Sequence, residues 1–407
     1  MTAVLRGPAV LRDALVPDAL VVVSGDRIER CGPASDVLPE LDTGTRAAAQ
    51  PLPEGAVLLP GLLDLHCHGA VGHDYADTDP DGARAAAAHH LWHGTTSSLA
   101  SVVSGSRDAT TAAIEALRPL VEEGVLAGLH LEGPYLSAAR CGAQNPRVLR
   151  DPDLDELAGW LAAAGGAVAS MTLAPERPGA LEAVAAVRAA GAVPAVGHTD
   201  ADEPTTSRFL RQAAGDGPVL VTHLFNGMRP WHHRDAGPVA AALAAAARGE
   251  AVVELIADGV HLDDATVRTV FDLVGPRQVA LVTDAMAAAG SADGRYRLGG
   301  LDVLVSRGVA RLAPTRPDGP PGSIAGGTTR LLDVVRRLVL DVGLPLVDVV
   351  TAASGTPAAV LSHRRRSPSP SVGSLRAGSR ADLLIAGPKF EPLAVMSGGH
   401  WVAGAPD

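Results

Sequence analysis

One segment of the sequence organises the rest, and it reads Leu59-Pro60-Gly61-Leu62-Leu63-Asp64-Leu65-His66-Cys67-His68-Gly69. Its apolar run from Leu59 to His66, interrupted by one acidic residue, predicts a buried parallel strand. Because side chains alternate along a strand, His66 and His68 should lie on one face, where both imidazoles can reach one metal ion. A single His-x-His pattern also occurs at the polar end of ordinary hydrophobic strands. The interpretation therefore depends on later segments of the same kind.

The composition is that of a globular protein rather than a disordered or fibrous one. The chain has 407 residues, 47% of them hydrophobic, which is enough for a large domain of about 250 to 300 residues and a small one. A formal net charge of −11 offers no basic face to nucleic-acid phosphates. No signal peptide or membrane span is visible, and the three cysteines make no disulfide framework. We therefore expect a protein of the reducing cytoplasm, with no nucleic-acid or membrane partner.

Strand-like and helix-like segments alternate through the middle of the chain. The candidate strands are residues 59–66, 95–103, 125–132, 168–173, 193–198, 219–223, 252–257 and 278–283. The helical runs between them are residues 83–92, 109–122, 153–163, 179–190, 204–214, 238–248 and 264–273. Eight strands alternating with helices predict a (β/α)8 TIM barrel. An open doubly wound sheet is the rival, but it normally carries a glycine-rich phosphate loop after its first strand, and His66-Cys67-His68-Gly69 is not one.

The two ends of the chain differ from the middle. Residues 1–58 and 371–407 contain short β-rich runs separated by Gly, Pro and Asp. We expect these two segments to form one small β-sandwich domain beside a catalytic barrel of residues 59–370. Within the barrel domain, residues 296–312 alternate like a β-hairpin with a turn near 306–308, and helical segments continue to about residue 361.

Groups able to bind a metal or move a proton end the predicted strands: His66, His68, Glu132, His198, His223 and Asp284. In a parallel barrel these ends point to one mouth, so the groups should converge on one or two divalent ions. Imidazole and carboxylate ligands suit Zn²⁺, with Fe²⁺, Co²⁺ and Mn²⁺ as alternatives. Each histidine alone could be a core residue, but chance would also scatter them among helices. A metal acidifies its bound water and Asp284 can carry the proton, so the pattern predicts a hydrolase.

Motifs of this kind run through nearly the whole chain. Besides the segment quoted first, they are His130-Leu131-Glu132-Gly133-Pro134-Tyr135, Gly197-His198-Thr199-Asp200-Ala201, Thr222-His223-Leu224-Phe225-Asn226-Gly227-Met228, Ala257-Asp258-Gly259-Val260-His261 and Val282-Thr283-Asp284-Ala285. The set resembles the N-acetylglucosamine-6-phosphate deacetylases of the amidohydrolase superfamily. His-Leu-Glu-Gly-Pro together with His-Leu-Phe-Asn-x-Met is specific to that family, whereas His-x-His alone indicates only the superfamily.

The resemblance implies a metal-dependent deacetylase of amino-sugar catabolism and cell-wall recycling, which releases glucosamine 6-phosphate and acetate. Glu132, His198 and His223 would hold the principal metal, and Asp284 would be the acid and base. His66 and His68 would form a second metal position. Many superfamily relatives bridge two metals with a lysine after strand 4, but this chain has Ala174-Pro175-Glu176 there. That leaves Glu132 as the bridge.

For the phosphosugar substrate, the resemblance assigns contacts to Ala143, Asn226, Gly227, Arg234, His261, Ile324, Ala325 and Gly326. Arg234 would bind the phosphate, because a guanidinium matches a phosphate fork. Its loop could serve its own site or, in a homodimer, the neighbour's. Relatives often have a histidine where this chain has Gln144, so the part of Gln144 in phosphate affinity is open. The same holds for a contact of Cys141 with substrate or metal.

Two alternatives to this function stay open. The first is the same chemistry on another substrate, such as N-acetylgalactosamine 6-phosphate or a cyclic amide, which the sugar contacts would decide. The second is a non-catalytic protein that keeps the amidohydrolase fold for binding. Its expected mark is the loss of a metal ligand or of the aspartate after strand 8, and this sequence keeps them all.

Overall fold

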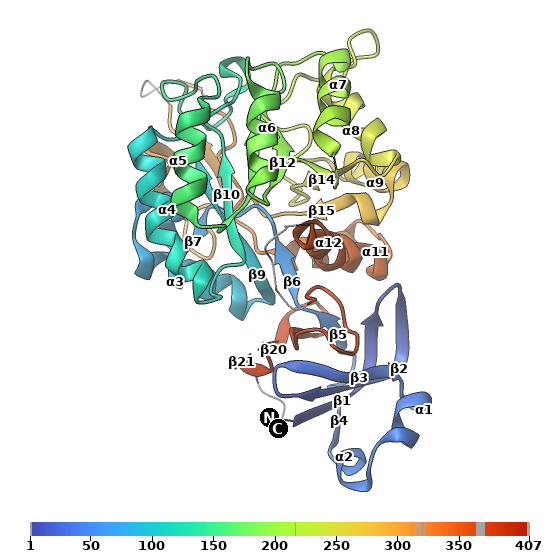
Figure 1. Ribbon diagram of the computed structural model, residues 1–407. Coiled ribbons are helices and arrows are strands. Elements are labelled where there is room, and N and C mark those ends of the chain that lie inside the picture. Colours follow the sequence, from blue (N-terminus) through green and yellow to red (C-terminus); the bar gives the residue numbers. More distant parts are fainter. Residues whose placement is uncertain are drawn as a thin grey trace.

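The computed structural model describes residues 2–215, 217–314, 316, 319–320, 322–363 and 371–404. It is an α/β protein in which a barrel surrounded by helices stands on a small β domain (Figure 1). The described residues form two sheets of eight strands each, one parallel and one mixed, together with smaller sheets of three and two strands.

The parallel sheet is a barrel whose strands follow one another in chain order. They are β6 Leu62–Asp64, β9 Thr95–Val103, β10 Gly128–Glu132, β11 Val168–Leu173, β12 Val193–Val196, β13 Val219–Val221, β14 Ala251–Leu255 and β15 Val279–Leu281. The first and last strands meet just beyond their ends, where a bridge joins Cys67 to Ala285. The (β/α)8 prediction is confirmed, and the doubly wound alternative is wrong.

The helices that cover the barrel also lie where they were predicted. They are α3 Pro80–Trp92, α4 Arg107–Glu122, α5 Leu154–Ala164, α6 Ala180–Ala189, α7 Glu203–Ala214, α8 Gly237–Ala247 and α9 Asp264–Val274. In α4, the Ser106 side chain accepts a hydrogen bond from the amide of Ala109 and caps the helix. Ala113, Leu117 and Leu120 recur at helical spacing and are buried. Tertiary packing of such apolar faces holds the outer ring on the sheet.

The small domain is built from both ends of the chain. Its strands are β1 Thr2–Leu11, β2 Ala14–Ser24, β3 Arg27–Pro33, β4 Ala49–Pro51, β5 Val57–Pro60, β19 Leu383–Ala386, β20 Pro392–Ser397 and β21 His400–Ala403. The core of this curled sheet joins Leu5, Val21 and Ile28 from the first strands to Leu383 and Ile385 from the last ones. The domain boundaries at residues 58 and 371 stay a prediction.

The predicted strand over residues 59–66 is wrong in one respect, because the structure divides it between the two sheets. Leu59 and Pro60 pair with β19 in the small domain, whereas Leu62 begins the barrel. At the junction, the Gly61 amide donates to the Asp382 carbonyl at 2.9 Å. A side chain at Gly61 would clash with Thr96. Gly61 is therefore the point at which the chain passes from one sheet to the other.

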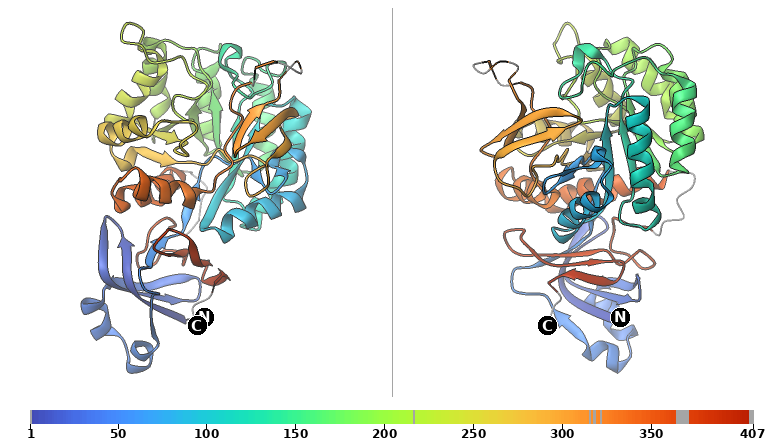
Figure 2. Two further views of the ribbon diagram at one scale, coloured as in Figure 1. Left: turned by 180° about the vertical axis from the view of Figure 1, so that it is seen from behind. Right: turned by 90° about the vertical axis from the view of Figure 1, so that its left-hand side faces the viewer.

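After the barrel, the chain forms a three-stranded antiparallel sheet: β16 Gly294–Leu298, β17 Leu301–Ser306 and β18 Val309–Leu312. The predicted turn near residues 306–308 is confirmed. Figure 2 shows this sheet in orange at the side of the barrel. Helices α10 Leu331–Arg336, α11 Leu346–Val350 and α12 Thr356–Ser362 follow, and residues 364–370 of the predicted barrel domain lie outside the described part. Within the described ranges, no helix combines the length and apolar character that a membrane crossing requires.

Candidate metal centre

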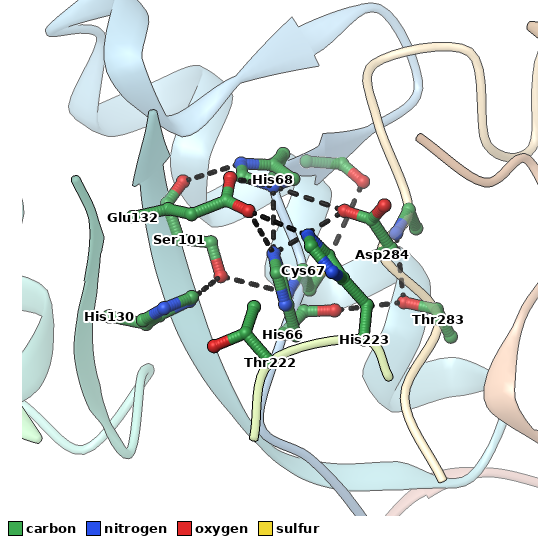
Figure 3. A network of polar contacts seen from close by, with 12 residues as sticks. His66, Cys67, His68, Ser101, His130, Glu132, Thr222, His223, Thr283 and Asp284 are labelled. Atoms are coloured by element: carbon green, nitrogen blue, oxygen red, sulfur yellow. Dashed lines mark hydrogen bonds and ion pairs between the residues drawn. The ribbon is translucent and has the colours of Figure 1, made fainter. Parts of the chain in front are cut away.

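The predicted metal and proton-transfer groups meet at the carboxyl ends of the barrel strands. His66 and His68 follow β6, Glu132 ends β10, and Asp284 follows β15 (Figure 3). His198 and His223 follow β12 and β13. All of these side chains are buried, and the most accessible of them, Asp284, exposes 8% of its surface. Residues far apart in sequence thus form one polar cluster inside an apolar barrel.

Backbone conformation helps to aim three of these groups. His198, His223 and Asp284 have positive φ angles of 47°, 30° and 49°. The left-handed region is costly for residues with a Cβ, at roughly 1–2 kcal/mol each. Each of these residues lies just after the end of its strand, where the backbone turns. Its side chain therefore points into the barrel mouth and no longer follows the in-and-out alternation of strand side chains. Such local strain is common at functional sites.

His198, His223 and Glu132 form the tighter of two candidate ligand groups. Glu132 Oε1 lies 3.0 Å from His198 Nε2 and 3.0 Å from His223 Nε2, and the two nitrogens are 3.2 Å apart. Donors about 2.0–2.1 Å from a tetrahedral zinc lie roughly 3.3 Å from one another. The ring of His198 is fixed from behind, because its Nδ1 donates to the Arg140 carbonyl at 2.9 Å. These residues therefore fit a divalent ion.

His66, His68 and Glu132 form the second group. The two Nε2 atoms are 3.0 Å apart, and His68 Nε2 lies 3.3 Å from Glu132 Oε2. Both histidines also approach Asp284 Oδ1, at 3.4 Å for His66 and 3.1 Å for His68. On the far side of the rings, His66 Nδ1 lies 3.2 Å from Glu254 Oε2. Glu132 thus belongs to both groups, with Oε2 turned to His68 and Oε1 also 3.7 Å from His66 Nε2.

The electrostatics of the cluster favour bound positive charge. Burial would lower the pKa of His66, but the carboxylates of Asp284 and Glu132 outweigh it and raise that pKa well above the usual value. Burial would also lower the pKa of His68, but its hydrogen bonds to the carboxylates of Asp284 and Glu132 raise that pKa to about 9. The same pairings hold the pKa of Asp284 below its ordinary value against the effect of burial. A divalent ion would replace these protons.

A layer of polar side chains supports the ligands from below, as Figure 3 shows. His130 bonds to Ser101 Oγ at 2.9 Å and to Thr172 Oγ1 at 2.7 Å. Nearby, Asp64 accepts a 2.5 Å hydrogen bond from Thr283 Oγ1. Burial, the largest influence, raises the pKa of Asp64 to about 6. This bond ties β6 to the segment after β15, beside Asp284.

A cavity of about 370 Å³ opens over the cluster. Its lining includes six of the residues predicted to bind substrate, namely Ala143, Asn226, Gly227, His261, Ile324 and Gly326. Ala325 lies between two of these but packs into the hydrophobic core under the β16–β18 sheet. Arg234 is exposed, and its guanidinium lies 2.8 Å from His233 Nε2. The structure does not bring Arg234 into the cavity of its own chain.

His261 enters the cavity from the loop after β14. Its Nδ1 lies 2.8 Å from Asp258 Oδ2, which leaves Nε2 as the second polar atom of the ring. Burial would lower the pKa of His261, but the hydrogen bond and charge of Asp258 raise it above the usual value. Asp258 thus fixes the ring of His261, which offers a hydrogen-bonding group at the cavity wall.

Several site residues were not predicted from the sequence. Arg311, on β18, lines the cavity and donates to the Gly322 carbonyl at 3.3 Å. Leu298 and Ser323 line it as well. Gln144, whose role the sequence left open, also lines the cavity and points inward to Glu132. Glu254 could have been found from the sequence, because an acid inside the buried strand β14 needs a polar partner.

The described residues give Cys141 no disulfide partner, and it is half-buried as a free thiol. It does not line the cavity, although the next residue, Gly142, does. Cys67, between the two ligand histidines, is fully buried and contacts His90 Nε2 at 3.3 Å. These observations assign neither thiol to the cluster.

Comparison with known proteins gives a consistent result. The Amidohydrolase family matches residues 57–402. An N-acetylglucosamine-6-phosphate deacetylase of Lysinibacillus sphaericus is 33% identical, with 81% of each chain covered. An N-acetylgalactosamine-6-phosphate deacetylase of Escherichia coli O157:H7 is 32% identical, over 84% of this chain and 88% of that one.

Among solved structures, a mutant N-acetyl-D-glucosamine-6-phosphate deacetylase of Mycobacterium smegmatis, in complex with N-acetyl-D-glucosamine-6-phosphate, is similar over its whole length. The TM-score is 0.88 at 36% identity, with 99% of each chain covered. The likeness therefore includes the small domain as well as the barrel.

Proposed function

The chain belongs to the amidohydrolase family and, within it, to the N-acetylglucosamine-6-phosphate deacetylases, and from this membership we propose that it hydrolyses N-acetyl-D-glucosamine 6-phosphate to D-glucosamine 6-phosphate and acetate. One observation carries the proposal: two ligand groups share Glu132 next to Asp284, at the floor of a cavity. A non-catalytic binding protein would not need this complete set. The reaction fits a place in amino-sugar catabolism and cell-wall recycling.

The bound ion, Asp284 and His261 would have different roles in the hydrolysis. A divalent ion, when bound, would polarise the acetamide carbonyl and acidify water. Asp284 is ionised at neutral pH, because His66 and His68 hold its pKa low. It can therefore accept a proton from the attacking water and return it to the amine that leaves. His261, whose ring Asp258 holds at the cavity wall, would bind and orient the acetylated sugar.

Zinc is the metal that we propose for the site, because two imidazoles and a carboxylate are zinc's usual donors. Glu132, His198 and His223 would hold the principal ion, and His66 and His68 a second one. The test measures acetate released from the phosphosugar after chelation and after zinc is added back. Activity should disappear and return, with one to two ions per chain by elemental analysis. Full activity in metal-free protein would contradict the proposal.

For the phosphate, we propose that Arg234 acts on the site of a second copy in a homodimer. The support is its position, since it is exposed and outside the cavity of its own chain. Mixing chains that carry Arg234→Ala with chains that carry Asp284→Asn tests this. A mixed dimer then has one complete site, so about a quarter of all sites should work after random assembly. If Arg234 serves its own chain, no activity returns, and Arg311 is the next candidate.

The choice between sugars is a further part of the proposal. The glucosamine substrate is favoured because the relative and the solved structure with the highest identities reported above both act on it. N-acetylgalactosamine 6-phosphate is the alternative substrate to test, because the E. coli relative is a deacetylase of that sugar phosphate. The kcat/KM values for the two phosphosugars should differ in favour of N-acetylglucosamine 6-phosphate. We place the enzyme in the cytoplasm, in keeping with its three free thiols.

A further inference from the structure

Gln144 lies against one of the proposed metal ligands, Glu132. It lies on the loop after β10, and 5% of its surface is exposed. Its Nε2 donates to Glu132 Oε2 at 2.6 Å, while its Oε1 accepts from the backbone amide of Ser104 at 2.8 Å. The side chain therefore links the end of β9 to the carboxylate at the end of β10.

The orientation of this amide follows from its partners. The Ser104 N–H can only donate, so it must face the oxygen of the Gln144 amide. The Glu132 carboxylate can only accept when ionised, so it must face the NH₂ group. An amide nitrogen has no lone pair to offer a metal. Gln144 can thus hold the carboxylate without competing with it as a ligand.

The two oxygens of Glu132 have different surroundings. Oε1 faces His198 and His223, at 3.0 Å from each ring nitrogen. Oε2 faces His68, at 3.3 Å, and Gln144, at 2.6 Å. The bond from Gln144 therefore fixes the rotation of the carboxylate, which turns Oε2 to His68 and Oε1 to the other ligand histidines. Within the described part of the chain, Oε2 would otherwise have only His68 as a donor, and a bound metal would occupy that ring nitrogen.

We propose that Gln144 is a positioning residue that sets the metal affinity of Glu132, above all at the position formed with His66 and His68. The inference rests on the proposed metal-dependent function, which it deepens. Partners behind a ligand usually contribute a factor of about 10 to 100 in metal affinity. Because Ala143, the preceding residue, lines the substrate cavity, the loop that holds Glu132 is also part of the substrate site.

The test compares two variants in full-length protein without substrate. Gln144→Met keeps the length of the side chain and removes both hydrogen bonds. Asn145→Ala is the matched control, because Asn145 is the next residue. Among the described residues, its side chain bonds only to the amide of Arg147 on its own loop, at 3.1 Å. Zinc binding is titrated against a chelator of known affinity. Thermal unfolding of the metal-free proteins reports whether the fold has changed.

We expect Gln144→Met to weaken zinc binding by about 10- to 100-fold and Asn145→Ala to leave it unchanged. At saturating zinc, the activity of Gln144→Met should recover towards that of the natural protein. Wild-type zinc affinity in Gln144→Met would overturn the proposal, as would a raised KM for the phosphosugar that excess zinc does not correct. If zinc binding depends on Gln144 but no acetate is released by either protein, the proposed function fails and the inference stands.

Discussion

The backbone amide of Asp284 donates to the backbone carbonyl of His66 at 2.9 Å. The proposed acid and base and the first ligand histidine are thereby joined by one of the bonds that close the barrel. His68 repeats the connection, because its amide donates to the Ala285 carbonyl at 2.7 Å. The same hydrogen bonds close the barrel and place His66, His68 and Asp284 next to one another. Substitutions that break them should therefore lower both stability and activity.

Asp284→Asn keeps the shape of the side chain but removes its ability to accept a proton. The catalytic rate should fall at least about a hundredfold while the substrate still binds. Steady-state kinetics, with the metal content of the variant measured alongside, checks this. Near-normal turnover with metal bound would remove Asp284 from the mechanism.

Arg234→Ala should separate phosphate recognition from deacetylation. Loss of charge-assisted bonds to a partly desolvated phosphate costs roughly 2–4 kcal/mol. The kcat/KM for the phosphorylated sugar should therefore fall about thirty- to a thousandfold. The poor rate on unphosphorylated N-acetylglucosamine should hardly change. Arg311→Ala is the comparison variant, because Arg311 lines the cavity, and equal losses on both sugars would assign Arg234 to the fold instead.

His90 should make the protein sensitive to acid. Burial is the main cause that lowers the pKa of His90 to about 4, whereas an unfolded histidine has a pKa of about 6.5. Its neutral form therefore supports folding above pH 6.5, and this stability is lost as the pH falls towards 4. The loss amounts to roughly 3 kcal/mol at most. In His90→Gln, the free energy of unfolding should depend less steeply on pH between 6.5 and 4, while equal slopes would reject this role.

Gly61→Ala should test the junction between the domains. The added methyl group meets Thr96, and such overpacking usually costs about 1–3 kcal/mol. Thr96→Ala should recover much of the loss when the two changes are combined, which denaturant unfolding of the single and double variants can measure. Purely additive effects would show that the clash is not what makes Gly61 necessary.

Strand and helix positions could be predicted because local patterns decide them. Val168–Leu173 is one example, a short and largely apolar segment between two helical runs, which the structure shows as a strand buried throughout. The convergence of His198, His223 and Glu132 also followed from sequence, since parallel strand ends share one rim. Periodicity did not reveal the division at Gly61, because an apolar run looks the same in either sheet. Glycine is needed at position 61 because any side chain there would clash with Thr96, and this tertiary contact cannot be read from the local sequence.

The rest of the site depends on which way loops and hairpins face. Arg311 alternates with Ala310 on β18 and could have faced solvent, but that strand lies against the cavity. Gln144 was considered for phosphate because relatives often have a histidine at this position, whereas its side chain turns back to Glu132. Neither orientation is encoded by local spacing, since each depends on a partner from another part of the chain.

The pairing of Leu59 in β5 with Leu384 in β19 has a consequence for synthesis. While the ribosome extends the chain, β1, β2 and β5 emerge first, but the strands that complete their sheet emerge last. The barrel strands are synthesised between these two sets and can fold first. The apolar side chains of Leu5 and Val21 stay uncovered until Leu383 and Ile385 have been synthesised. A premature stop before β19 would therefore release an intact set of barrel strands attached to an uncovered sheet. Such a fragment should aggregate even though every proposed metal ligand is present.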